Sequence, residues 1–215
     1  DASRRSVRLN LVGVSHSYGT SVVLNQVDLQ FEPGQSVALV GPSGVGKSTL
    51  LAIAGGLLIP DEGEVEITTT EQVSKPVTKV RNDIGWIFQT TNAFGNRSGL
   101  NNVVGHLRLR GWDRSEAEQR TRSLAEELQI LDVIHKPVRT MSGGERQRLG
   151  IIRALSDRPE ILLADEPTGQ LDDQSSKAVV RSIVHNRPAG GLCIIVTHDP
   201  AVAAECHRQV EMPFS

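Results

Sequence analysis

Two adjacent carboxylates follow an apolar run in "ILLADEPTGQLDD", which spans residues 161–173. The residues "ILLA" are typical of a buried strand, and Asp165 and Glu166 come directly after them. Neighbouring like charges repel, and burying either one without a partner costs several kcal/mol. A nearby cation would remove this cost. The pattern therefore predicts a metal site, and it raises the question of whether the chain also holds a phosphate.

A phosphate site is predicted by "GPSGVGKST" at residues 41–49. This stretch matches G-x-x-x-x-G-K-[ST] between a predicted strand and a predicted helix. Glycines let the backbone curl so that amide groups point at phosphate oxygens, and the helix presents its positive N-terminal end. The alternative is a glycine turn without a ligand. The residues expected to bind nucleotide here are Gly41, Ser43, Gly44, Gly46, Lys47, Ser48 and Thr49.

The two predicted sites support each other. Lys47 is expected to reach the β- and γ-phosphates, and the Ser48 hydroxyl is expected to ligate Mg²⁺. In such proteins a carboxylate at the end of a neighbouring strand holds the same Mg²⁺, a role for which Asp165 is suited directly or through water. Glu166 would then lie beside the γ-phosphate and accept a proton from an attacking water. The plainer interpretation is a helix N-cap carboxylate beside a spare glutamate.

A second glycine-containing sequence, "MSGGERQR" at residues 141–148, precedes a helical pattern. Ser142 and Glu145 have the spacing of a capping box for that helix. Two glycines inside a cap cost backbone entropy, but bare amides at a helix N-terminus suit an anion. Because the first loop already surrounds one phosphate, we expect Ser142, Gly143 and Gly144 to face the nucleotide of another subunit.

Four apolar runs, three of which end in polar residues, predict buried strands of a mainly parallel sheet, with helical patterns between them. They are "SVALV", "DIGWIFQ", "PEILLADE" and "LCIIVTHD". Residues 7–35 and 60–80 alternate and contain turn signals, which predicts a small antiparallel sheet. Residues 99–135 look like an inserted helical subdomain. We therefore predict one α/β domain over 1–215. Its nucleotide-binding core and β subdomain cover about 1–90 and 150–215, and its helical subdomain covers about 91–149.

Composition narrows the possible partners and compartment. The net charge is −2, so nothing favours general binding to nucleic acid. Cys193 and Cys206 are too few for a disulfide scaffold, which favours the cytosol. No stretch approaches the roughly 20 apolar residues of a membrane-spanning helix. The start of the sequence, "DASRRSVRLN", lacks the apolar segment of a signal peptide.

Taken together, nearly the whole chain resembles the ATPase subunits of ABC transporters. Residues 41–49 are similar to the Walker A motif, 141–148 to the signature motif and "ILLADE" to the Walker B motif. Met141 and Glu145 depart from the Leu and Gln that are more usual in the signature motif. The resemblance implies a P-loop NTPase core, hydrolysis of ATP with Mg²⁺, and a homodimer that encloses ATP.

The same resemblance assigns four further residues. Gln89, after "IGWIF", is similar to the Q-loop glutamine, which contacts the metal and the attacking water. His198, in "IIVTHD", is similar to the switch histidine that contacts the γ-phosphate. Asp172, in "GQLDD", matches the D-loop position, and Tyr18 matches the residue that stacks on adenine. The catalytic residues implied are thus Lys47, Gln89, Glu166 and His198, and the metal ligands are Ser48, Gln89 and Asp165.

The stretch "ADEPTGQLD" resembles the "ADEPTGNLD" of MacB-type and lipoprotein-releasing ATPases, with Gln170 in place of Asn. This implies a peripheral subunit on the cytoplasmic face of the membrane, driving a permease for a drug, peptide, haem or lipoprotein. One alternative is a non-transporting complex in cell-wall remodelling or division. Another is a soluble DNA-repair or ribosome-associated ATPase, which usually needs a coiled-coil insertion or a second cassette.

Segment 90–105 is expected to form the docking groove for the permease. It is more polar than the apolar segment usual after the Q-loop, which predicts contacts rich in hydrogen bonds. The polar residues concerned include Thr90, Thr91, Asn92, Asn96 and Arg97.

Overall fold

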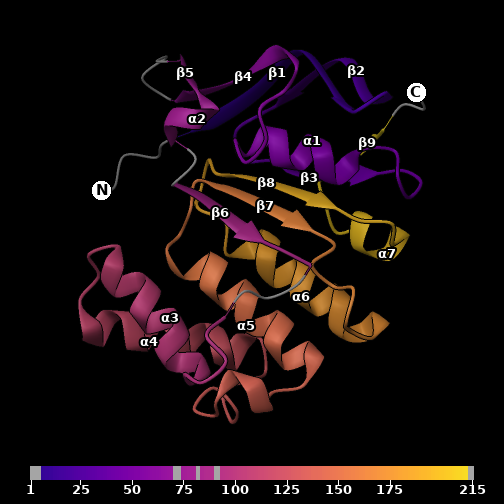
Figure 1. Cartoon of the computed structure of the whole chain (residues 1–215). Helices are drawn as coiled ribbons and strands as arrows, with labels where there is room; N and C mark the ends of the chain where they lie inside the picture. Colours follow the sequence, from indigo (N-terminus) through magenta and orange to yellow (C-terminus); the bar gives the residue numbers. More distant parts are fainter. Residues whose placement is uncertain (1–5, 70–73, 81–82, 90–92, 213–215) are drawn as a thin grey trace.

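The computed structural model describes residues 6–69, 74–80, 83–89 and 93–212. The chain builds two β-sheets, with helices packed between them and on the far side of one of them (Figure 1). One sheet has five strands in the order β6-β7-β8-β3-β9, and the other has four in the order β2-β1-β4-β5. The predicted combination of a parallel sheet, a smaller antiparallel sheet and a helical region is confirmed.

The five-stranded sheet is parallel at each of its four ladders. Its strands are β3 (Ser36–Val40), β6 (Ile84–Ile87), β7 (Ile161–Asp165), β8 (Leu192–Val196) and β9 (Arg208–Glu211). The first four were predicted, whereas β9 was not. Strand β9 lies at the edge, pairs with β3 and is largely exposed, so its sequence lacks the apolar run that marks a strand buried on both faces.

The antiparallel sheet was predicted from alternation at residues 7–35 and 60–80. Its strands are β1 (Val7–Tyr18), β2 (Ser21–Phe31), β4 (Glu62–Thr69) and β5 (Ser74–Pro76). A tight turn joins β1 to β2, and Gly19 in that turn has a φ of 61°. Strand β1 ends at Tyr18, at the tip of this hairpin, where Tyr18 is paired with Ser21.

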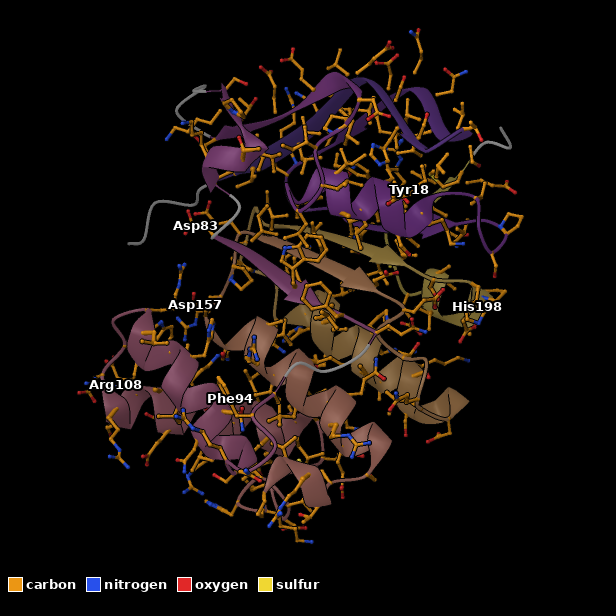
Figure 2. The ribbon with its side chains drawn as sticks, in the orientation of Figure 1. Tyr18, Asp83, Phe94, Arg108, Asp157 and His198 are labelled. Atoms are coloured by element: carbon orange, nitrogen blue, oxygen red, sulfur yellow. The ribbon has the colours of Figure 1, made fainter. Side chains whose placement is uncertain are left out.

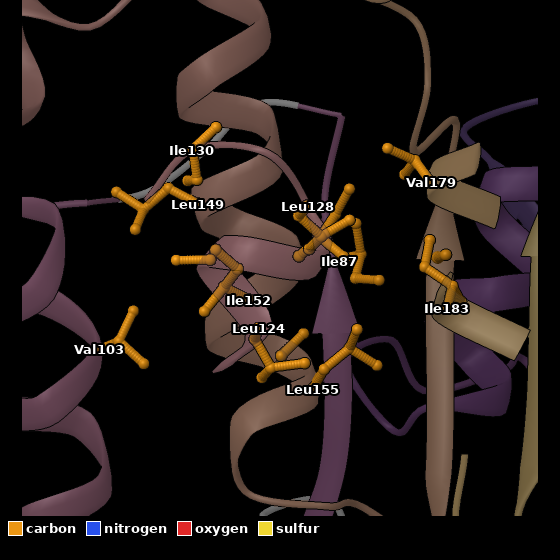
Figure 3. Packing of buried hydrophobic residues seen from close by; sticks show 14 of the residues in the cluster. Ile87, Val103, Leu124, Leu128, Ile130, Leu149, Ile152, Leu155, Val179 and Ile183 are labelled. Carbon is orange, nitrogen blue, oxygen red and sulfur yellow. The ribbon is translucent and has the colours of Figure 1, made fainter. Parts of the chain in front are cut away.

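The two faces of the parallel sheet belong to two hydrophobic cores. The first core contains α1 (Lys47–Ala54) and the antiparallel sheet, and the second contains α5 and α6. On β7, Ile161 and Leu163 pack with α1 and the antiparallel sheet, whereas Leu162 and Ala164 pack with α5 and α6. Figure 3 shows part of the second core. Because side chains alternate along a strand, Asp165 continues the face covered by α1. This alternation decides which helix the first carboxylate can reach.

Four longer helices cover or extend beyond the second face of the parallel sheet (Figure 1). They are α3 (Gly99–Leu109), α4 (Arg114–Glu127), α5 (Gly143–Ser156) and α6 (Asp173–His185). Shorter elements are α2 (Val77–Val80), the 3₁₀ turn η2 (Val138–Thr140) and α7 (Pro200–Ala203). The predicted subdomain limit near residue 149 falls inside α5, and the division itself stays a prediction. In the described ranges, each helix is too short or too polar to cross a membrane.

Candidate active site

The glycine-rich loop joins β3 to α1 and depends on backbone angles that favour glycine. Gly41, Gly44 and Gly46 have φ values of 147°, 82° and 98°. At Gly46 a Cβ would lie 2.8 Å from Cγ1 of Val23 and 3.1 Å from Cδ2 of Leu24, both on β2. The hairpin that ends in Tyr18 therefore packs directly on the loop, and a side chain at Gly46 would separate them.

Lys47 lies at the start of α1 and is buried, with only 7% of its surface exposed. Its Nζ donates to the carbonyl oxygens of Gly41 and Pro42, at 2.8 Å each. The ammonium is thus held inside the curl of the loop, whereas Ser43 is exposed and Thr49 is half-buried. This arrangement keeps a positive charge at the centre of the predicted phosphate site.

Ser48 and Asp165 meet across the gap between α1 and β7. The Ser48 Oγ donates to the Asp165 Oδ1 at 3.0 Å, although the residues are 117 positions apart. Two neighbouring ligands of an octahedral Mg²⁺, each bound at about 2.1 Å, lie about 3.0 Å apart. The oxygen pair therefore fits one edge of a magnesium site.

Glu166 and His198 form the next pair along the same edge of the sheet. The Glu166 Oε1 lies 2.8 Å from the His198 Nδ1, and because a carboxylate only accepts, Nδ1 donates. The exposed fractions of the two side chains are 18% and 72%. The backbone of Glu166 has a φ of 45°, while its N–H donates to the carbonyl of Val196 on β8. A carboxylate in this position can accept a proton from water on its open side.

Gln89 and Tyr18 are two further residues predicted at this site. The Gln89 Nε2 is 4.0 Å from the place a Cβ would take on Gly169, in the turn after Glu166. Tyr18 is 57% exposed, and its ring meets the buried His16 ring edge to face at 4.9 Å. Figure 2 shows Tyr18 beside α1 and His198 beyond β8, on the same side of the molecule. The Tyr18 ring is therefore largely open to solvent on the side of the molecule that also carries His198.

At the start of α5, the capping box is present. The Ser142 Oγ accepts from the Glu145 N–H, and the Glu145 side chain accepts from the Ser142 N–H. A Cβ on Gly143 would lie 2.6 Å from the Gln170 Oε1, and one on Gly144 would lie 3.2 Å from the Leu171 Cδ2. The glycines thus have a packing reason within the chain, and their predicted second anion site stays a prediction.

Asp172 caps the next helix, since its Oδ1 accepts from the Ser175 N–H at 3.0 Å. It closes the segment that begins at Glu166 and packs against the start of α5 through Gln170 and Leu171. The segment that ends at the predicted D-loop residue therefore contacts both α5 and α6.

One residue of this region was missed by sequence reasoning. Gln147, on α5, is 3% exposed, and its Nε2 donates to the carbonyls of Pro167 and Glu166 at 2.7 Å and 3.4 Å. A glutamine between Arg146 and Arg148 looks like a surface residue of a polar helix. Its only sequence signal is the helical spacing that puts it one turn after Gly143 and Gly144.

A family model described as ABC transporter matches residues 24–169. The chain belongs to this family. It is an ATP-binding and ATP-hydrolysing ABC transporter domain, as the motifs predicted.

Among similar proteins, the lipoprotein-releasing system ATP-binding protein LolD of Shewanella sp. (strain MR-4) is 39% identical, over 97% of this chain and 94% of that protein. The macrolide export ATP-binding/permease protein MacB of Rhodopseudomonas palustris (strain BisB18) is also 39% identical, over 90% of this chain and 30% of that protein. A solved dimeric structure of the ATP-binding cassette MJ0796, bound to ADP and Pi, has a TM-score of 0.81 and 30% identity. It covers 95% of this ABC domain and 94% of that chain.

Proposed function

We propose that this ABC domain energises a membrane permease of the LolD or MacB type. The work would be export or extraction of a hydrophobic or amphipathic cargo, with the domain held on the cytoplasmic face of the membrane by the permease. The similarity to LolD and MacB supports the type of system. The catalytic part of the proposal rests on two neighbouring side-chain pairs, Ser48–Asp165 and Glu166–His198. The first pair supplies two oxygen ligands suited to Mg²⁺, and the second supplies a carboxylate base next to them.

ATP would be held by the loop from Gly41 to Thr49, with its adenine on Tyr18. The Lys47 ammonium now donates to two loop carbonyl oxygens. It would donate to the phosphate oxygens instead once ATP is bound, because those oxygens accept hydrogen bonds from the same ammonium. Mg²⁺, held by Ser48, Asp165 and Gln89, would neutralise charge on the phosphates. His198 donates to Glu166, which keeps the carboxylate oriented toward an attacking water and the imidazole close to the γ-phosphate.

Two copies would complete each site. Ser142 is exposed at the positive N-terminus of α5, and the Gly143 and Gly144 amides follow it. In the proposed homodimer these groups meet the phosphates bound by the partner, and Asp172 lies near the same boundary. Separate copies would thus bind ATP but assemble the complete site only together.

The test of the catalytic role is Glu166→Gln. The amide keeps the shape and can still accept from His198 through Oε1, but it cannot take a proton from water. We expect ATP turnover of the purified domain to fall by about 10²–10⁴-fold, with ATP binding retained. Exposed Glu64 on β4 provides the matched control, and Glu64→Gln should leave turnover unchanged. Near-normal turnover in Glu166→Gln would contradict the assignment.

A further inference from the structure

We propose that Gln147 is a positioning residue for ATP hydrolysis, which fixes the Glu166 carboxylate by holding its backbone from α5. The inference rests on the proposed function, because it takes Glu166 as the base. It concerns how the catalytic carboxylate is placed and which helix controls that placement.

The first observation is the unusual backbone of Glu166. Its φ of 45° lies in the left-handed region, which strains a residue with a side chain and persists only where the surroundings impose it. The conformation redirects the chain at the end of β7. The direction of the Glu166 side chain therefore depends on whatever stabilises this turn.

The second observation is that Gln147, on α5, donates hydrogen bonds to the turn at Glu166. Its Nε2 donates to the Pro167 carbonyl at 2.7 Å and to the Glu166 carbonyl at 3.4 Å. The Glu166 carbonyl also accepts from the Gly169 N–H at 3.3 Å, which closes the turn. One buried carboxamide thus holds two consecutive carbonyls at the position where the backbone is strained.

The third observation is an imbalance in the hydrogen bonding of Gln147. Two carbonyl acceptors require Nε2 to face them, and among the described residues no donor meets the buried Oε1. A buried acceptor without a donor lowers the stability of the folded state. The unpaired Oε1 offsets part of what the two donated hydrogen bonds contribute, and the geometry of those bonds ties Gln147 to the Glu166 turn.

The fourth observation is that Gln147 belongs to the helix that begins with the signature motif. Residues 170 and 171 of the loop after Glu166 also pack on Gly143 and Gly144, at the start of α5. A displacement of α5 would therefore carry the Glu166 turn with it. Gln147 provides the direct polar link between the α5 N-terminus, proposed to meet the partner's ATP, and the base of its own site.

The first experiment replaces Gln147 with methionine, which has a similar length and no donor. We expect the kcat for ATP to fall by about 10- to 100-fold, as for other small misplacements of a catalytic group. The KM for ATP and the thermal unfolding midpoint should stay close to those of the unaltered domain. Gln119→Met, at an exposed position on α4, is the matched control and should change neither kcat nor stability.

The second experiment uses Gln147→Glu, whose carboxyl can donate to Pro167 only when it is protonated. Burial raises the pKa of such a carboxyl, so the donor should return as the pH falls. We expect turnover relative to the unaltered domain to rise from about pH 8 to about pH 6. A ratio that stays flat with pH would overturn the proposed hydrogen bond, even if Gln147→Met failed to fold.

A double-variant cycle separates the inference from the proposed function. In the Glu166→Gln background, Gln147→Met should cause no further loss, because it acts through Glu166. The same fold loss in both backgrounds, or a raised KM with unchanged kcat, would overturn the inference. An inactive Glu166→Gln with a fully active Gln147→Met would contradict the inference alone. Near-normal turnover of Glu166→Gln would contradict the proposed base and the inference with it.

Discussion

Glu166 combines a strained backbone with a paired side chain. Its neighbour Asp165 still belongs to β7 and points to the α1 face, where it meets Ser48. The left-handed turn at Glu166 ends this alternation, so that two consecutive carboxylates reach two different partners. The like-charge repulsion implied by the sequence is thereby reduced, since one carboxylate accepts from a hydroxyl and the other from an imidazole.

At Gly46, the prediction is that alanine weakens nucleotide binding by moving the loop. The added Cβ would lie 2.8 Å from Val23, in addition to the strain of a φ of 98°. We expect Gly46→Ala to weaken ATP affinity at least about tenfold in a binding titration, about 1.4 kcal/mol. Gly34 is the control, because it has a φ of 76° but open space where a Cβ would lie. Gly34→Ala should lower stability through strain and leave ATP affinity unchanged. Equal affinities for both variants would contradict the role given to the loop–hairpin contact.

At the scale of elements, α3, the segment before it and the start of α4 form a hollow of about 350 Å³, lined by Arg97, Asn101, Val104, Gly105, Arg108 and Arg114. Three of these residues are arginines. Buried Asn102 bonds both the N–H and the carbonyl of Phe94, which leaves the Phe94 ring exposed with the Arg97 guanidinium over it at 5.0 Å. Of the predicted docking residues, Thr90, Thr91 and Asn92 lie outside the described part, whereas Asn96 and Arg97 are exposed. The hollow is basic, but Val104 and the arginine stems give its lining more apolar than polar surface, so the docking groove stays a prediction.

The corresponding prediction concerns Arg97→Glu, which reverses the charge at the edge of this hollow. We expect basal ATP turnover of the free domain to persist, while co-purification with the permease or its stimulation of turnover drops, because a polar contact loses its partner. Arg122→Glu, on the exposed side of α4, should have no such effect. Unchanged assembly and stimulation in Arg97→Glu would show that docking occurs elsewhere.

At the scale of the whole molecule, the two predicted anion-binding elements pack on opposite faces of the parallel sheet. Helix α1 follows the phosphate loop and belongs to the first core, whereas α5 carries Ser142 and belongs to the second core. Figure 1 shows the two helices separated by the sheet. This separation supports the proposal that α5 serves the site of a second copy.

The whole-molecule prediction is therefore ATP-dependent dimerisation. The Glu166→Gln domain should be monomeric or weakly associated without ATP and dimeric with it, because ATP bound between copies stabilises the dimer while hydrolysis is blocked. Adding Ser142→Arg, which fills the α5 N-terminus, should abolish the dimer in light scattering. Ser123→Arg, at an exposed site on α4, should not. One unchanged association state under all conditions would contradict a shared site.

The sequence by itself determined the parts of this ABC domain that are contiguous. The loop from Gly41 to Thr49, the carboxylates after β7 and the capping box of Ser142 and Glu145 each lie within a few residues. Local backbone geometry and helix or strand period are enough to predict such features. The four buried strands were likewise marked by their own apolar runs.

Tertiary structure alone decided the contacts between distant segments. Ser48 meets Asp165, Gln147 holds the turn at Glu166 and Gln170 lies on Gly143 only because α1 and α5 pack on particular faces of the sheet. Periodicity tells which side of a helix is buried but not which carbonyls it will face. Strand β9 shows the same limit, since an exposed edge strand is defined by its hydrogen bonds to β3 rather than by its own composition.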